Sequence, residues 1–301
     1  MFSRILVASD LSLASERVLD CVAGWKAGGL QKVVIAHVHN IGYAAGAAGL
    51  EESLRRDHEP KLEAQAQRIR DAGLHARWRL EFGVPYLEIQ RIAEEEGCEA
   101  VVIGSHGASW VKEVWLGSIG DAILRHVQKT PVLVIKVNRL LELTPGECDG
   151  FCNSLFTKAL IATDFSSGAQ SALRIAEQLA GRYQAELHLV HVQERVRLFP
   201  HLVHRLEEFN EEDRRRLEEI AQRLRNAGAS AVSWALLTEH PVPGILQAIA
   251  EWEPRLVVVG RRGRGGPARR LIGSTSHDVA RESPVPVLVT PATVSSEEEV
   301  S

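Results

Sequence analysis

The sequence predicts two tandem domains of the α/β class, each a doubly wound, five-stranded parallel sheet with helices on both faces. The first observation is an alternation of short valine-, isoleucine- and leucine-rich runs with amphipathic helical patterns, which is typical of a parallel sheet buried on both faces. The second is an internal repeat. The third is a length of 301 residues, which exceeds the size at which a single core usually stops growing.

The internal repeat relates the two halves of the chain position by position. The recurring segments are ILVASDLS and LIATDFS, VVIAHVHN and LHLVHVQE, VVIGSHG and VVVGRRG, and PVLVIK and PVLVTP. Their offsets lie between 154 and 156 residues, so that Asp10 corresponds to Asp164 and His37 to His191. A period of that size indicates a duplicated domain and not a solenoid.

The elements of the first half follow from apolar periodicity and from helix start and stop signals. Strands are expected at 4–9, 32–38, 75–83, 100–105 and 131–136, and helices at 13–28, 53–73, 85–97 and 118–128. Gly28 and Gly29 stop the first helix, Pro60 kinks or restarts the second, and Pro85 suits the first turn of the third. The second half repeats this order, with a long helix at 201–228.

The repeat also sets the expected domain boundaries. The first domain is predicted at 1–138 and the second at 156–294. Residues 139–155, which include Pro145, Gly146 and Gly150, are interpreted as a short ordered linker. An acidic tail at 295–301 is expected to be disordered.

Two glycine-bearing loops carry the chemical signal. Each follows a strand and opens a helix with the spacing Gly, two residues, Gly, nine residues, Gly, Ser; the members are Gly104, Gly107, Gly117 and Ser118 in the first half, and Gly260, Gly263, Gly273 and Ser274 in the second. A glycine after a strand lets the backbone approach a ligand, and a helix N-terminus favours an anion. Both loops are therefore candidate phosphate sites; the alternative is a pair of tight turns kept for packing.

On these motifs the chain resembles tandem universal stress proteins of the ATP-binding subtype, almost end to end. The resemblance implies an adenine nucleotide alpha hydrolase-like fold and a nucleotide site in each half. It implies that Asp10 and Asp164 bind the ribose or a metal on the phosphates, although both could instead be plain helix caps. It places Val38 and Val192 against the adenine, with Ile103 and Val259 lining the base pocket. Thr275, which follows Ser274 in the second half, is also expected among the nucleotide-binding residues.

The two loops differ in charge. The second is basic, with Arg261, Arg262, Arg264, Arg269 and Arg270, whereas in the first Lys112 and Glu113 offset each other beside His106. Guanidinium groups bind phosphate well, so the second site is expected to attract anions more strongly. The alternative is a solvated basic face or a partner surface.

Other motifs of nucleotide and hydrolase chemistry do not occur in the sequence. It has no Gly-x-x-x-x-Gly-Lys-Ser/Thr loop, no Gly-x-Gly-x-x-Gly fingerprint and no Gly-x-Ser-x-Gly elbow. His201 and His204, three residues apart on a predicted helix, could hold a metal. For His37 and His191, which repeat at the ends of their strands, a structural role is favoured over catalysis. The expected function is ATP binding, with Mg²⁺ as a candidate companion, and at most slow hydrolysis.

The composition limits partners and location. A net charge of −4 argues against a dedicated nucleic-acid-binding protein. No apolar run is long enough to cross a membrane, and the N-terminal segment lacks signal-peptide features, so a cytoplasmic protein is expected. Cys21 and Cys98 are interpreted as core residues. Cys148 and Cys152 are interpreted as incidental thiols, with a redox pair or a metal clip as the alternative.

The resemblance also suggests how the halves associate. The last strands of the two domains, 131–136 and 286–290, are expected to pair antiparallel and make the chain an internal pseudo-dimer that could also form a homodimer. The leading functional hypothesis is an ATP-binding stress-response regulator that signals to a protein partner. The alternatives are a nucleotide-free interaction scaffold and a slow ATPase.

Overall fold

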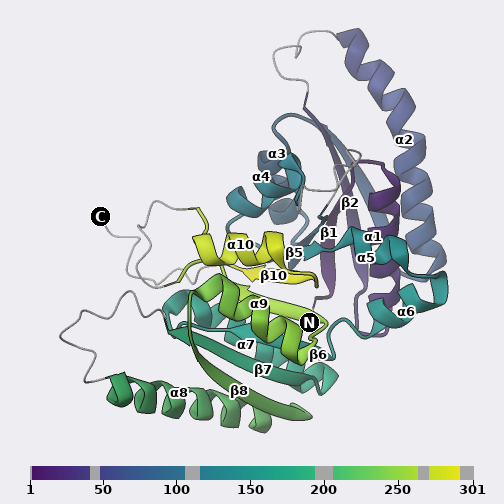
Figure 1. Cartoon of the computed structure of the whole chain (residues 1–301). Coiled ribbons are helices and arrows are strands. Elements are labelled where there is room, and N and C mark those ends of the chain that lie inside the picture. The colour runs from purple at the N-terminus through teal and green to yellow at the C-terminus, as the bar shows by residue number, and fades with distance from the viewer. Residues whose placement is uncertain (1, 41–47, 106–115, 194–205, 264–270, 292–301) are drawn as a thin grey trace. The chain divides into compact units, whose positions relative to one another are not determined.

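The structure is a computed structural model that describes residues 2–40, 48–105, 116–193, 206–263 and 271–291. The chain divides into two compact units, residues 1–154 and 155–301. The predicted acidic tail lies outside the described residues. Each unit is an α/β domain, as the alternation of strands and helices predicts (Figure 1).

The first unit contains a parallel sheet in the order β3-β2-β1-β4-β5. Its strands are β1 (Arg4–Ala8), β2 (Lys32–His39), β3 (His75–Phe82), β4 (Ala100–Gly104) and β5 (Val132–Ile135). The central strands are almost entirely buried, because valine, isoleucine and leucine occupy both faces. The strand order reverses between β1 and β4, and this switch point is where ligands bind in open α/β sheets.

Helices cover both faces of this sheet. α1 (Leu13–Ala23), followed by the 3₁₀ turn η1 (Gly24–Lys26), and α2 (Ala48–Asp71) pack on one face. α3 (Pro85–Glu95) and α4 (Ser118–His126) pack on the other (Figure 1). α2 continues through Pro60, so of the two expectations there, a kink or a restart, the restart is wrong. Buried Leu62, Ala66 and Ile69 offset the helical hydrogen bond that a proline removes.

The segment predicted as a linker is helical and belongs to the first compact unit. It forms α5 (Val137–Glu142) and α6 (Pro145–Asn153), both packed on α1. The start of α6 is a capping box in which the Thr144 side chain accepts from the backbone and the Glu147 carboxylate accepts from the Thr144 N–H at 2.9 Å.

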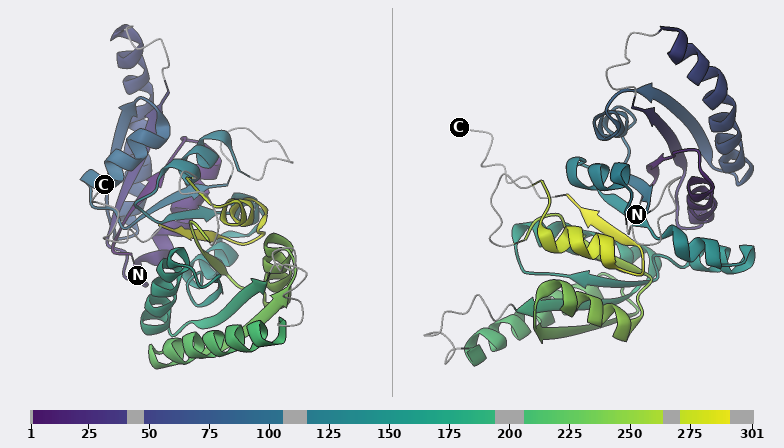
Figure 2. Two further views of the ribbon diagram at one scale, coloured as in Figure 1. Left: turned by 90° about the vertical axis from the view of Figure 1, so that its left-hand side faces the viewer. Right: turned by 45° about the horizontal axis from the view of Figure 1, so that its top comes forward.

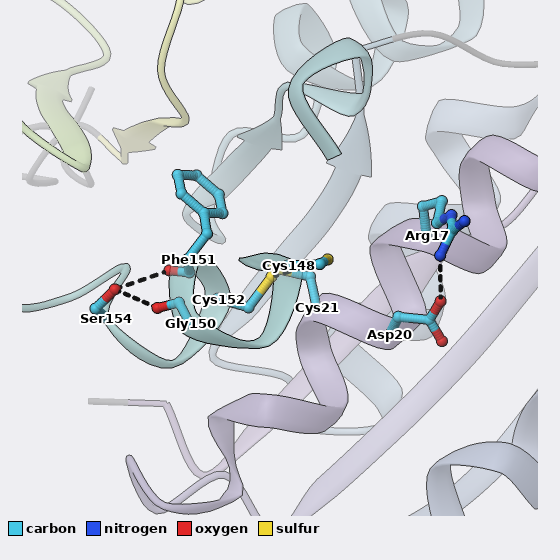
Figure 3. Close-up of a disulfide and its surroundings, with 8 residues drawn as sticks. All are labelled: Arg17, Asp20, Cys21, Cys148, Gly150, Phe151, Cys152 and Ser154. Atoms are coloured by element: carbon cyan, nitrogen blue, oxygen red, sulfur yellow. Dashed lines mark hydrogen bonds and ion pairs between the residues drawn. A yellow bond between two sulfur atoms is a disulfide. The ribbon is translucent and has the colours of Figure 1, made fainter. Parts of the chain in front are cut away.

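A disulfide corrects two of the cysteine interpretations. Cys21 of α1 is bonded to Cys152 of α6, so Cys21 is not simply a core thiol and Cys152 is not incidental (Figure 3). Sequence alone could not pair them, because the pairing depends on how α6 packs on α1 and not on spacing along the chain. Cys98 and Cys148 are buried free thiols.

The second unit repeats the architecture with the order β8-β7-β6-β9-β10. The strands are β6 (Lys158–Ala162), β7 (Glu186–Gln193), β8 (Ala231–Thr238), β9 (Leu256–Gly260) and β10 (Val287–Thr290). The helices are α7 (Ser167–Tyr183), α8 (Leu206–Asn226), α9 (Pro241–Trp252) and α10 (Ser274–Glu282). Figure 2 shows this unit from two further directions. The expected start of the long helix, with His201 and His204, lies outside the described residues.

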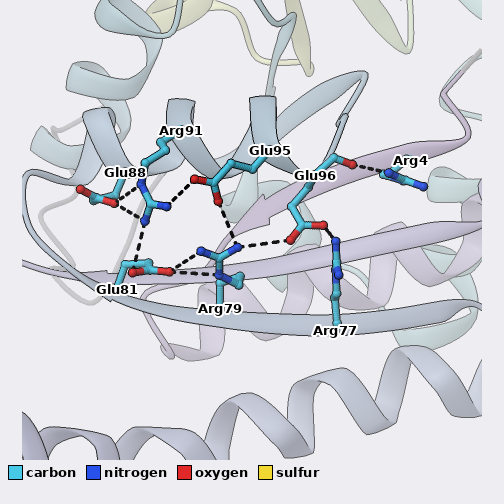
Figure 4. A network of polar contacts seen from close by, with 8 residues as sticks. All are labelled: Arg4, Arg77, Arg79, Glu81, Glu88, Arg91, Glu95 and Glu96. Atoms are coloured by element: carbon cyan, nitrogen blue, oxygen red, sulfur yellow. Dashed lines mark hydrogen bonds and ion pairs between the residues drawn. The ribbon is translucent and has the colours of Figure 1, made fainter.

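An ion-pair network fastens the edge strand β3 to the end of α3 (Figure 4). The Arg79 guanidinium reaches Glu81, Glu95 and Glu96, and Arg77 also pairs with Glu96. Arg4 of β1 donates to the Glu96 carbonyl. Glu96 is 5% exposed, so its charge depends on these arginines.

Within the described parts of the chain, no helix combines the length and the apolar composition that a membrane crossing requires.

Candidate functional site

The turn after the first strand of each unit is built around an aspartate. Asp10 follows β1, and its Oδ1 atom accepts from the Ser12 N–H at 3.1 Å, from the Ser12 hydroxyl and from the Ser15 hydroxyl at 2.6 Å. Asp164 follows β6 and accepts in the same way from the Ser166 N–H at 3.0 Å and from its hydroxyl. The two carboxylates therefore hold corresponding positions at the ends of central strands, where the sequence predicts them.

Neither aspartate is itself the helix cap. Ser12 caps α1 and Ser166 caps α7 through their side chains, and the aspartates hold these serines. The residue between the aspartate and the serine, Leu11 in the first unit and Phe165 in the second, has a positive φ angle of 62° and 59°, respectively. Such a conformation is unfavourable for a side-chain-bearing residue and is concentrated at functional sites. Sequence reasoning missed these serines, although the repeated SDLS and TDFS segments contain them.

Each glycine-bearing loop leaves a strand and returns to a helix with its two ends joined. The Gly117 N–H donates to the Ser105 carbonyl at 3.0 Å, and the Gly273 N–H donates to the Arg261 carbonyl at 2.8 Å. Gly117 and Gly273 are the N-caps of α4 and α10, and neither forms a side-chain cap hydrogen bond.

The helices accordingly begin at Ser118 and at Ser274, which is followed by Thr275. The first N–H groups of a helix have no partner within the helix, and a helix N-terminus favours an anion. Gly107 lies outside the described residues, as does most of each loop.

In the second unit the loop glycines approach the aspartate turn closely. A Cβ atom added at Gly260 would lie 2.5 Å from the Gly168 carbonyl oxygen, and one added at Gly263 would lie 2.5 Å from Asp164 Oδ2. A Cβ at Gly168 would overlap the Arg262 carbonyl. Glycine is therefore required on both sides of this contact. Gly104, the first-unit counterpart of Gly260, likewise ends β4.

The residues expected at the base lie near the strand ends but differ in burial. Val38 and Val192 are half-buried near the ends of β2 and β7. Ile103 and Val259 are only 2% and 3% exposed, which leaves little of either side chain for a ligand. Val192 also borders α9, because a Cβ at Gly244 would lie 3.1 Å from its methyl carbons.

Arg261 points into the second unit. It is 1% exposed, and its guanidinium donates to the Leu271 carbonyl at 3.3 Å, so it links the two ends of the loop. Burial, with the neighbouring Arg262 charge as a smaller cause, lowers the pKa of Arg261 to about 10. The other charged loop residues lie outside the described part of the chain; they are His106, Lys112, Glu113, Arg264, Arg269 and Arg270.

The repeated histidines make the same backbone contact in both units. His37 Nδ1 lies 2.8 Å from the Ser9 carbonyl, and His191 Nδ1 lies 2.7 Å from the Thr163 carbonyl. A carbonyl only accepts hydrogen bonds, so Nδ1 carries the proton in each ring. This contact joins the second strand of each unit to the end of the first.

The surroundings of the other ring nitrogen differ between the units. His191 Nε2 lies 3.4 Å from Asp213 on α8, whereas α2 offers His58 to His37, with ring centroids 5.0 Å apart. His39 completes a cluster of three rings in the first unit. Among the described residues, no three imidazole, thiol or carboxylate groups meet in a way that could hold a metal ion.

Comparisons with known proteins point to one family. The sequence pattern of the Universal stress protein family matches residues 1–136 and again 155–291. A universal stress protein from Methanocaldococcus jannaschii is 30% identical over 156 residues, which is 45% of this chain and 96% of that protein. One from Mycobacterium tuberculosis (strain H37Rv) is 29% identical over 227 residues, which is 73% of this chain and 70% of that protein.

A solved structure matches over nearly the full length. The crystal structure of a universal stress protein from Archaeoglobus fulgidus DSM 4304 is similar with a TM-score of 0.73 and 28% sequence identity, covering 97% of this chain and 99% of that one. The double match of the family pattern and this full-length similarity confirm the prediction of two tandem domains of one type.

Proposed function

Because the chain belongs to the universal stress protein family, we propose that it is a regulatory protein of the stress response that binds one adenine nucleotide in each unit. ATP is the proposed nucleotide, and binding rather than rapid turnover is the proposed activity. The observation that carries this proposal is the repeat, at the switch point of each sheet, of an aspartate turn and a helix N-terminus without a side-chain cap; in the second unit Gly263 also lies close to Asp164.

The phosphates are proposed to bind at the joined ends of each loop. Gly117 and Gly273 present helix N-termini without a side-chain cap, so an anion can take the backbone N–H groups there. Ser118 and Ser274 add hydroxyl donors at the first helical position. In the second unit the close packing of Gly263 on Asp164 keeps side-chain atoms out of the space beside the carboxylate.

The nucleoside is proposed to lie against the strand ends. Val38 and Val192 retain enough exposure to contact a base, whereas the buried Ile103 and Val259 would support the pocket from within the sheet. Asp10 follows β1 in the first unit, and Asp164 follows β6 in the second. At either position a carboxylate can accept from ribose hydroxyls or bind Mg²⁺ on the phosphates.

The experiment is to identify and count the bound nucleotide. Mass spectrometry of the supernatant after denaturing freshly purified protein should detect ATP or ADP, and calorimetric titration of stripped protein with ATP and Mg²⁺ should give two sites per chain. One site per chain would limit the proposal to one unit. No released nucleotide and no binding heat at millimolar ATP would contradict it and favour the protein-interaction scaffold.

A further inference from the structure

Three of the four cysteines gather where α6 packs on α1 (Figure 3). The Cys21–Cys152 disulfide joins residues separated by 131 positions, with their Cα atoms 5.0 Å apart. The Cys148 sulfur lies 3.9 Å from the Cys152 sulfur, four residues earlier on the same helix. All three side chains are buried, at 0%, 4% and 1% exposure for Cys21, Cys148 and Cys152. A free thiol thus lies beside a disulfide inside one packed interface.

We propose that these residues form a thiol–disulfide exchange site, in which Cys148 displaces Cys21 from Cys152 and so releases α6 from its covalent bond to α1. The inference is independent of nucleotide binding, because it rests on the contact between these two helices.

The exchange is balanced in atoms and electrons. The Cys148 thiol gives up its proton, and its sulfur attacks the Cys152 sulfur. A Cys148–Cys152 bond forms, the Cys21–Cys152 bond breaks, and the electron pair of the broken bond leaves on the Cys21 sulfur, which takes up a proton. One thiol and one disulfide are present before and after, so the step consumes no oxidant or reductant.

The exchange and the intact last turns of α6 exclude each other. Residues four apart on a helix have Cβ atoms about 5–6 Å apart, whereas a disulfide brings its Cβ atoms to about 3.5–4.5 Å. A Cys148–Cys152 bond therefore requires the backbone of residues 148–152 to leave helical geometry. The product has lost both the covalent bond between α6 and α1 and the helical geometry of residues 148–152. The two disulfide pairings therefore correspond to two different conformations of α6.

The surroundings keep the exchange slow at neutral pH. Burial raises the pKa of the Cys148 thiol, and the carboxylates of Asp20 on α1 and Asp149 on α6 raise it further, with Arg17 acting in the opposite direction. The raised pKa keeps Cys148 a protonated thiol beside the disulfide at neutral pH. Since only the thiolate attacks a disulfide, the exchange is slow under these conditions. Alkaline conditions, or a loosening of α6, would speed the exchange.

Disulfide mapping of the full-length chain tests the proposal. Oxidised protein is incubated without reductant at neutral and at mildly alkaline pH, quenched and alkylated in acid, and digested for mass spectrometry. Peptides joined through Cys21–Cys152 should give way in part to peptides joined through Cys148–Cys152, about tenfold faster for each pH unit while Cys148 stays mostly protonated. A chain that keeps only the Cys21–Cys152 bond at both pH values would overturn the proposal.

Variants separate this route from others. Cys148→Ala should abolish the appearance of free Cys21, while Cys98→Ala, at the remaining buried thiol, should leave its rate unchanged. Free Cys21 arising equally fast in Cys148→Ala would show that Cys148 is not the attacking group. Oxidised Cys21→Ala should form the Cys148–Cys152 bond and show at least about tenfold faster amide exchange over 148–152 than its reduced form; equal protection in both forms would contradict the change in conformation.

Discussion

Gly263 lies against Asp164 so closely that a Cβ atom at position 263 would be 2.5 Å from the Asp164 Oδ2 atom. Gly263→Ala should therefore displace either the loop or the carboxylate, and we expect it to weaken nucleotide binding in the second unit by at least about tenfold, equivalent to about 1.4 kcal/mol. Titration calorimetry should then show one strong site per chain in place of two.

The matched control for this change is Gly150→Ala. Gly150 lies in α6, and a Cβ atom there meets nothing within 4 Å, so alanine should leave both sites intact. If the Gly263→Ala and Gly150→Ala variants bound nucleotide with equal affinity in both units, Gly263 would not be part of the nucleotide site.

The capping serines should contribute measurably to stability. Ser12→Ala and Ser166→Ala each remove the side chain that caps α1 or α7 and that donates to the adjoining aspartate. We expect each to lower the free energy of unfolding of its own unit by about 1 kcal/mol, as for other helix caps. Urea titration followed by hydrogen exchange, which resolves the two units, is the measurement. Ser53→Ala, on the exposed side of α2, should change stability little, and an equal effect would contradict a capping role.

Much of the fold could be predicted because strand and helix periodicities repeat in both halves. The helices of the segment 139–155 were missed, although Thr144, Pro145 and Glu147 together form a recognisable start signal. The Cys21–Cys152 bond was out of reach, because pairing depends on how α6 docks and not on spacing along the chain.

The candidate site was predicted in its parts and not in its contacts. The two aspartates follow the strands, Gly104 and Gly260 end strands, and helices begin after Gly117 and Gly273, as the repeat predicts. Sequence could not show that Gly263 contacts Asp164, 99 positions away, or that Arg261 turns inward to the Leu271 carbonyl. A run of arginines does not reveal which one the fold will bury, because burial depends on the path of the loop. Whether these residues bind nucleotide stays a prediction.

The buried carboxylate of Glu96 should matter more than its exposed neighbour in the same network. Glu96 is 5% exposed and pairs with Arg77 and Arg79, whereas Glu95 is 45% exposed at its side chain. Glu96→Gln keeps the shape but removes the charge, and we expect a loss of about 1–2 kcal/mol in the stability of the first unit. Glu95→Gln should change the stability of the first unit much less, because solvent screens the ion pairs of an exposed carboxylate. Equal losses, measured by urea titration with hydrogen exchange, would show that burial does not set the importance of these pairs.

The histidine cluster should make the first unit sensitive to acid. Burial lowers the pKa values of His37 and His58 below their ordinary 6.5, and for His58 the neighbouring rings of His37 and His39 add to the effect. For His37 the hydrogen bond to the Ser9 carbonyl and the charge of Asp10 raise the pKa again, whereas His39 lowers it. Asp57 raises the pKa of His58, and Lys61 lowers the pKa of both rings. The unfolded chain then binds more protons than the folded one below about pH 6.5, so stability is fully present above that pH and declines as pH falls through it.

An exchange of residues between the units tests this assignment. Asp213 of α8 faces His191 where His58 of α2 faces His37, so each residue can be replaced by its counterpart. His58→Asp removes one proton-binding ring and gives His37 a carboxylate partner, and it should flatten the decline in stability of the first unit below pH 6.5. Asp213→His should steepen the decline in the second unit. Hydrogen exchange of β2 and β7 amides across this pH range measures both, and an unchanged slope in His58→Asp would show that the cluster does not set the acid response.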